Sequence, residues 1–201
     1  TPRTINMSTI GDDLLRDATP DFGPKIEALV VYNSNPVAVA PESRKVLRGF
    51  QREDLYTVVL EHFMTDTADQ ADIVLPATTQ LEHLDVHTSY GHTYVMRNDP
   101  AIAPLGEARP NTQVFRELAR AMGYDEPCFD DDDEALARAA FRAAHVDPTA
   151  LRERGWMKLP IADAPFADGG FPTPDGRCRI DAPGLGIPDH LTNYESTAST
   201  P

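Results

Sequence analysis

Three short apolar segments dominate the first half of the chain. They run from Ile26 to Tyr32, from Leu55 to Leu60 and from Asp72 to Leu75, and their aliphatic and β-branched residues are typical of strands. An amphipathic stretch over residues 41–50 lies between the first two segments. It begins with Pro41-Glu42 and predicts a helix. Strand, helix and strand in this order form a βαβ unit with parallel strands. The unbroken apolar runs indicate a sheet buried on both faces.

The second half of the chain has a different pattern. From Thr78 to Arg109 there is little periodicity, and a loop of this length is uncommon unless it is functional. Asn111 is then predicted to cap an amphipathic helix that ends at Gly123. Two further helices are predicted, one from Glu134 to His145 and one from Asp147-Pro148 to near Gly155. The whole pattern predicts an α/β fold, a Rossmann-like parallel sheet with flanking helices.

Proline and glycine become frequent beyond Trp156, which is typical of a linker or a domain edge. Within this part, Thr173 to Ile180 is predicted to form a turn that leads into a strand. The acidic run from Asp130 to Asp133 lacks the glycine and the distant glutamate of a calcium loop. We interpret it as negative charge at the N-terminus of the following helix.

Charge and cysteine content exclude several classes of function. The 201 residues carry a net charge of -14, which argues against nucleic-acid and anionic-membrane partners. No apolar run approaches the roughly 20 residues of a membrane-spanning helix. Cys128 and Cys178 are too few and too far apart for a cluster or a structural zinc site, and we expect packed thiols. The chain starts with Thr1-Pro2-Arg3, so any targeting signal is expected further upstream.

Polar residues follow the predicted strands where ligands gather in parallel sheets. Asn33-Ser34-Asn35 follows the first strand, and Glu61 ends the second, where an acid commonly holds ribose hydroxyls. An anionic nucleotide would also need cations, and the candidates in the chain are Lys25, Arg44, Arg48, Arg97 and Arg109. The sequence therefore predicts a nucleotide site at the carboxyl edge of the sheet. A glycine-rich Gly-x-Gly-x-x-Gly turn is missing, which argues against a nicotinamide-dependent dehydrogenase.

Several motifs share one order with a known family. They are Asp-Thr-Ala at 66–68, Ala-Asp-Ile-Val-Leu-Pro-Ala at 71–77, Leu-Glu-His at 81–83 and Gly-Glu-Ala-Arg-Pro-Asn at 106–111. In these motifs the chain resembles the molybdopterin-dependent oxidoreductases of the dimethyl sulfoxide reductase family, which includes formate dehydrogenases, nitrate reductases and sulfoxide reductases. The resemblance extends from about Arg3 to Arg179. It implies that residues 1–155 are part of the dinucleotide-binding α/β domain, and that residues 156–201 are a linker and the start of a β-barrel-like C-terminal domain.

The resemblance also implies a set of cofactor-binding residues. They lie in the turn after the first strand, at the end of the second strand, in the long loop and at the start of the next helix: Asn33, Ser34, Asn35, Leu60, Glu61, His83 and Asn111. Asn111 departs from the family, because relatives often carry a guanine-binding aspartate there. Ser89-Tyr90-Gly91-His92 is a second departure, from Asn-x-Glu-Gly-Arg. Zinc at His83, His87 and His92 is an alternative that their irregular spacing does not favour.

The complete enzyme implied by the resemblance carries molybdenum on two molybdopterin guanine dinucleotides and performs two-electron chemistry on a small substrate. The metal ligand, and possibly a 4Fe-4S cluster, are implied upstream of this chain, so no catalytic or metal-binding residue is predicted within it. The implied partners are the rest of the same enzyme chain and possibly an electron-transfer subunit, without membrane insertion, in the cytoplasm rather than the periplasm. The alternative is a non-catalytic nucleotide-binding α/β module.

Overall fold

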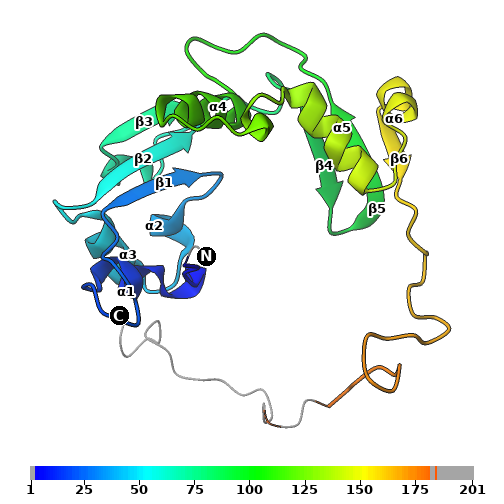
Figure 1. Cartoon of the computed structure of the whole chain (residues 1–201), viewed down its shortest axis with the longest axis horizontal. Helices are drawn as coiled ribbons and strands as arrows, with labels where there is room; N and C mark the ends of the chain where they lie inside the picture. The colour runs from blue at the N-terminus through cyan, green and yellow to red at the C-terminus, as the bar shows by residue number, and fades with distance from the viewer. Residues whose placement is uncertain (1–2, 182–183, 185–201) are drawn as a thin grey trace. The chain divides into compact units, whose positions relative to one another are not determined.

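The computed structural model describes residues 3–181 and 184 (Figure 1). The chain forms two compact units. The first contains the described residues up to Asp85 together with Asn98–Ala135, and the second contains Val86–Arg97 together with the described residues from Leu136 onward. Among the described residues, no helix is long and apolar enough to cross a membrane.

The first unit is built on a parallel three-stranded sheet. Its strands are β1 (Ala28–Tyr32), β2 (Tyr56–Glu61) and β3 (Ile73–Pro76), in the order β1-β2-β3. Both pairings are parallel, and the register aligns Tyr32 with Leu60 and Leu60 with Leu75. The three predicted strands, their adjacency and their direction are therefore confirmed. Their common direction brings the carboxyl ends of all three strands to one edge of the sheet.

Short helices connect and flank these strands. They are η1 (Met7–Thr9), α1 (Ile10–Leu15), α2 (Pro36–Val39), α3 (Ser43–Phe50), η2 (Ala68–Gln70), α4 (Asn111–Ala121) and η3 (Pro127–Phe129). The predicted helix over residues 41–50 begins two residues late, because Glu42 adopts a left-handed conformation with φ 58° and interrupts the chain before Ser43. A separate short helix, α2, precedes it.

One face of the sheet is buried and the other is only partly covered. Val31 and Val59 point into a core that contains Leu14, Val46 and Phe50, from α1 and α3. On the opposite face α4 covers the end of β1, where the rings of Tyr32 and Phe115 meet edge to face at 4.9 Å. Other side chains of this face are 41–51% exposed, namely Val30, Tyr56 and Ile73. The prediction of burial on both faces is therefore wrong for these described residues.

Two glycines allow α1 and α3 to pack closely. A Cβ atom on Gly49 would lie 2.7 Å from Leu14 Cβ, and a Cβ atom on Gly11 would lie 2.9 Å from the backbone nitrogen of Val46. Neither contact leaves room for a side chain. These helices bring Leu14 and Val46, both fully buried, against the buried face of the sheet.

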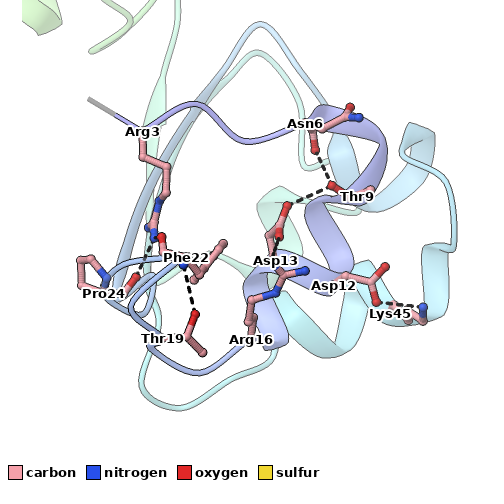
Figure 2. A network of polar contacts seen from close by, with 10 residues as sticks. All are labelled: Arg3, Asn6, Thr9, Asp12, Asp13, Arg16, Thr19, Phe22, Pro24 and Lys45. Carbon is pink, nitrogen blue, oxygen red and sulfur yellow. Dashed lines mark hydrogen bonds and ion pairs between the residues drawn. The ribbon is translucent and has the colours of Figure 1, made fainter. Parts of the chain in front are cut away.

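A polar network holds the N-terminal segment against the rest of the first unit (Figure 2). The Arg3 guanidinium donates to the backbone oxygen of Phe22 and lies 4.2 Å from the centre of its ring, and Arg16 lies 4.8 Å from the same centre. Asp13 accepts a hydrogen bond from Thr9 and pairs with Arg16. The polar groups of this network find their partners within the chain, so we interpret the network as one that stabilises the fold.

The second unit contains most of a small sheet, most of one helix and the whole of another. Its strands, β4 (Asp85–Ser89), β5 (His92–Asn98) and β6 (Trp156–Lys158), pair in the order β4-β5-β6, and β5 and β6 are antiparallel. The segment from Thr78 to Arg109 is therefore not unstructured throughout, and Tyr90 and Gly91 connect two strands. The prediction missed these strands because they expose polar residues on both sides of a short apolar centre, with only Val95 buried.

Helices α5 (Asp133–Ala143) and α6 (Pro148–Arg154) confirm the two helices predicted in this part. Asp132 Oδ1 accepts the backbone N–H of Ala135 at 2.7 Å, so the acidic run acts at a helix N-terminus as predicted. Asp147 caps α6 in the same way, through the N–H of Thr149 at 2.9 Å. Gly155 ends α6 in the left-handed conformation with φ 79°.

The C-terminal part differs from the prediction. Thr173 forms the predicted turn, in which its hydroxyl contacts Asp175 and the backbone oxygen of Arg177, but no strand follows up to Ile180. The proposed start of a barrel-like domain extends into residues 182–201, most of which lie outside the described part of the chain, and the boundary at residue 155 stays a prediction. Cys128 and Cys178 are both exposed, so the prediction of packed thiols is wrong.

Candidate functional site

The carboxyl ends of the three parallel strands form the edge where polar residues gather. Glu61 aligns with Pro76 in the β2-β3 pairing, and Tyr32 aligns with Leu60 in the β1-β2 pairing. The residues after each strand therefore lie along one edge, which is where ligands bind in open parallel sheets. The edge extends past β3, because Ala77 forms a parallel bridge with Arg109.

Asn33 and Asn111 meet at this edge although they are distant in sequence. Asn33 adopts a left-handed conformation with φ 51°, and its side-chain oxygen accepts a hydrogen bond of 3.0 Å from Asn111 Nδ2. Asn111 is the first residue of α4, and Pro110 occupies the cap position without a side-chain hydrogen bond. The prediction that Asn111 caps this helix is therefore wrong. Its Oδ1 atom is buried and has no hydrogen-bond partner among the described residues.

Asn35 fixes the turn after β1 to the segment after β2. Its Oδ1 accepts hydrogen bonds from the backbone N–H and the hydroxyl of Thr67, at 3.2 and 2.7 Å. The Thr67 hydroxyl in turn accepts the N–H of Val37 at 3.0 Å, and Thr67 is fully buried. Ser34, between the two asparagines, is exposed and has no hydrogen bond with any other described residue. The turn is therefore held rigidly while Ser34 faces solvent.

Glu61 ends β2 and lies half-buried at the edge. Its Oε1 accepts the N–H of His62 at 2.8 Å, and its other oxygen has no partner among the described residues. Leu60 precedes it inside the sheet, with its side chain 3% exposed. Of this predicted pair, Glu61 is the residue whose side chain can reach a ligand.

Two imidazoles make polar contacts with Thr78, which lies just after β3. The backbone oxygen of Thr78 lies 2.9 Å from His62 Nε2, and its hydroxyl lies 2.8 Å from His83 Nδ1. Thr78 itself is buried. His83 Nε2 lies 3.8 Å from Asp85 Oδ2. His83 is thereby placed in the segment that follows this edge, on the same residue, Thr78, that His62 contacts. His62 is the residue that follows Glu61 at the end of β2.

A buried carboxylate, Glu82, organises the same segment. Its Oε2 accepts the N–H and the hydroxyl of Thr79 at 2.7 and 2.9 Å, and its Oε1 accepts the N–H of Leu105 at 2.7 Å. Hydrogen bonds from the Thr79 backbone and hydroxyl lower the pKa of Glu82 below its usual 4.5. The ionised Glu82 carboxylate therefore contributes to the free energy of unfolding above about pH 4.5. This contribution is lost as the pH falls through the lowered pKa of Glu82 in the folded state.

Two of the predicted cations lie at different ends of the sheet. Lys25 lies at the opposite end of the sheet, where it pairs with Asp54 at 2.6 Å before β2 begins. Arg109 is at the edge, where its backbone pairs with Ala77, and its side chain pairs with Glu117. Among the described residues, no group of three or more His, Cys, Asp or Glu side chains could hold a metal ion.

A cavity of about 500 Å³ lies between α4 and the partly covered face of the sheet. Its walls are largely apolar and include Leu60, Leu75 and Phe115, with Arg109 and Glu117 at its margin. It lies on this face of the sheet and extends to the carboxyl ends of β2 and β3, since Leu60 and Pro76 line it. Of the predicted cofactor-binding residues Leu60 alone borders it, and of the predicted cations Arg109 does, so we do not assign the predicted nucleotide site to this cavity.

Four residues of this edge were missed in the sequence: His62, Thr67, Thr78 and Glu82. Thr67 and Thr78 follow strands β2 and β3, which is a signal that could have been used. Glu82 could not have been recognised, since its partner Leu105 is 23 positions away in a segment without periodicity.

The comparisons with known proteins agree with the geometry. Residues 20–121 match the family model described as molybdopterin oxidoreductase. The chain is 42% identical to the probable oxidoreductase YoaE of Bacillus subtilis over 90% of its length, and 28% identical to the dimethyl sulfoxide/trimethylamine N-oxide reductase of Rhodobacter capsulatus over 76%. Acetylene hydratase from Pelobacter acetylenicus shares the fold, with a TM-score of 0.72 and 23% identity over 96% of the chain.

The chain spans only part of these proteins: 26% of YoaE, 19% of the Rhodobacter reductase and 27% of acetylene hydratase. The matched family model covers about half of the chain, including the parallel sheet, its carboxyl edge and α4. The resemblance to the dimethyl sulfoxide reductase family found in the sequence is thereby confirmed. The chain belongs to the molybdopterin oxidoreductase family.

Proposed function

We propose that the carboxyl edge of the β1-β2-β3 sheet binds the nucleotide end of a molybdopterin guanine dinucleotide. We further propose that the complete protein is a molybdenum-dependent oxidoreductase acting on a small substrate. The observation that carries the proposal is the buried Asn111 Oδ1 atom, an acceptor that has no partner in the described part of the chain and lies at the predicted ligand edge. Buried polar atoms are almost always hydrogen-bonded, so an orphan of this kind indicates a missing donor.

The residues at the edge fit a nucleotide. A guanine base offers N–H donors, and Asn111 Oδ1 is free to accept one of them. Ribose offers hydroxyl donors, for which the unpaired oxygen of Glu61 is suited. The hydrogen bonds of Asn35 to Thr67 hold the turn that presents Asn33 and Ser34. The chain therefore binds and orients the cofactor, and the molybdenum centre supplies the redox chemistry when it is bound.

Other parts of the proposed enzyme lie outside this chain. We propose that the molybdenum is held on two such dinucleotides, with its protein ligand and any 4Fe-4S cluster in the rest of the enzyme chain. An electron-transfer subunit is the proposed partner in turnover. Oxidoreductases among the relatives support this assignment, although each is several times longer than the chain described above.

Changing Asn111 to leucine in the complete protein tests the proposal. Leucine has a similar volume and removes the unpaired acceptor together with the hydrogen bond to Asn33. Removing the buried unpaired acceptor stabilises the cofactor-free protein, whereas removing the hydrogen bond to Asn33 destabilises it. We therefore expect its free energy of unfolding to change by less than about 1 kcal/mol. Molybdenum and guanine nucleotide retained under limiting cofactor supply should fall by about tenfold.

Asn111→Asp is the matched control, because a carboxylate keeps an acceptor at the same place. It should retain the cofactor. If Asn111→Leu instead lowered the stability and left the cofactor content of the folded protein unchanged, Asn111 would be a structural residue and the proposal would lose its main support.

A further inference from the structure

The segment from Thr79 to Leu105 carries exposed apolar side chains at both of its ends. Ile102 and Leu105 are 55% and 82% exposed, and Leu81 is also exposed. Their backbones are nevertheless tied down, since the N–H groups of Ala101 and Ile102 both donate to the backbone oxygen of Leu81, at 2.8 and 3.1 Å. Polar contacts rather than burial therefore close the base of this segment.

Glu82 makes the central contact of this closure. It is 7% exposed, and its two oxygens accept three hydrogen bonds from both ends of the segment, two from Thr79 and one from Leu105. Hydrogen bonds to a carboxylate are stronger than those between neutral groups. The carboxylate of Glu82 therefore joins the two ends of the segment directly.

The same side chain adjoins a predicted cofactor residue. His83 follows Glu82 directly, and its backbone oxygen accepts a hydrogen bond of 2.9 Å from Asn98. Its imidazole is held by the hydroxyl of Thr78, which is itself 3% exposed. The backbone of His83 therefore enters the turn that Glu82 closes, while its ring is fixed on the end of β3.

We propose that Glu82 is a positioning residue for the cofactor site: its carboxylate closes the base of the 79–105 segment and thereby holds the His83 imidazole on Thr78, facing the ligand edge. The inference rests on the proposed function. Glu82 does not touch the cofactor in this arrangement, because its oxygens are occupied by Thr79 and Leu105. It acts through His83.

Glu82→Gln in the complete protein is the sharpest test. The glutamine amide has one oxygen, so it cannot accept from Leu105 N–H and from both donors of Thr79. Amide hydrogen exchange in peptides covering 79–105 should become about tenfold faster. Molybdenum and guanine nucleotide retained after dialysis should fall by a similar factor. Glu53→Gln, an exposed glutamate before β2, is the matched control and should change neither measurement.

A double variant separates positioning from general stability. If Glu82 acts through His83, Glu82→Gln should lower cofactor retention much less in a His83→Ala background than in the wild-type background. An equal loss in both backgrounds would overturn the inference, and so would wild-type retention in Glu82→Gln. If Glu82→Gln does not fold, cofactor retention is compared between Thr79→Ala and Thr79→Ser instead. Only the alanine variant removes the hydroxyl that donates to Glu82. A wild-type protein without cofactor would instead refute the proposed function.

Discussion

Glu61→Ala should lower the affinity of the complete protein for its dinucleotide cofactor by about five- to 150-fold. Glu61 stands at the carboxyl end of β2 with one oxygen unpaired among the described residues. If that oxygen accepts a ribose or guanine donor, the alanine variant leaves the donor without a partner, at a cost of about 1–3 kcal/mol. At about 1.4 kcal/mol per tenfold change, this cost corresponds to the stated range. Molybdenum and guanine nucleotide per protein, measured under limiting cofactor supply, report the loss.

Glu53→Ala is the matched control for this prediction. Glu53 carries the same charge, is exposed and lies before the opposite end of the same strand. It should leave cofactor loading unchanged. Full loading of the Glu61→Ala protein would show that Glu61 is only an exposed acid at a strand end and would remove it from the site.

Phe50→Ala should lower the free energy of unfolding of the first unit by about 3–5 kcal/mol. The Phe50 ring is 3% exposed in the core between α3 and the buried face of the sheet. The close approach of α1 and α3 at Gly49 leaves these helices little freedom to move into the space that the ring would vacate. Urea unfolding of wild-type and variant chains measures the difference.

Phe63→Ala provides the control for Phe50. Phe63 is 76% exposed, so its removal should change the free energy of unfolding by less than about 0.5 kcal/mol. A comparable loss of stability in the two variants would mean that the core of the first unit is not where the structure places it.

The sequence predicted the parallel sheet because the relevant signals are local. Each strand is an apolar run bounded by turn residues. The order of strand, helix and strand then requires parallel strands joined by a right-handed crossover. The same order brings Asn33 and Glu61 to one edge. The contact between Asn33 and Asn111 confirms that the start of α4 lies there too, as the prediction required.

Other features depend on contacts that no local pattern encodes. The left-handed conformation of Glu42 divides the predicted helix, and β4 to β6 are short strands with little alternation. The hydrogen bonds of Glu82 to Leu105 and of Asn35 to Thr67 join segments that are 23 and 32 positions apart. Such pairs become visible only when the chain is folded.

Part of the sheet is exposed in this chain, which spans about a quarter of the length of YoaE and of acetylene hydratase. Val30, Tyr56 and Ile73 form part of an apolar face that α4 covers only at one end. Parallel sheets are ordinarily covered on both faces.

The central claim is that this chain forms part of a guanine dinucleotide site in a molybdenum enzyme. Its most direct test is the metal and nucleotide content of the complete wild-type protein, produced with an adequate supply of molybdenum and purified without cofactor addition. Our account predicts stoichiometric molybdenum together with guanine nucleotide released on acid hydrolysis. A folded protein that contains neither, or that releases a different nucleotide, would contradict it.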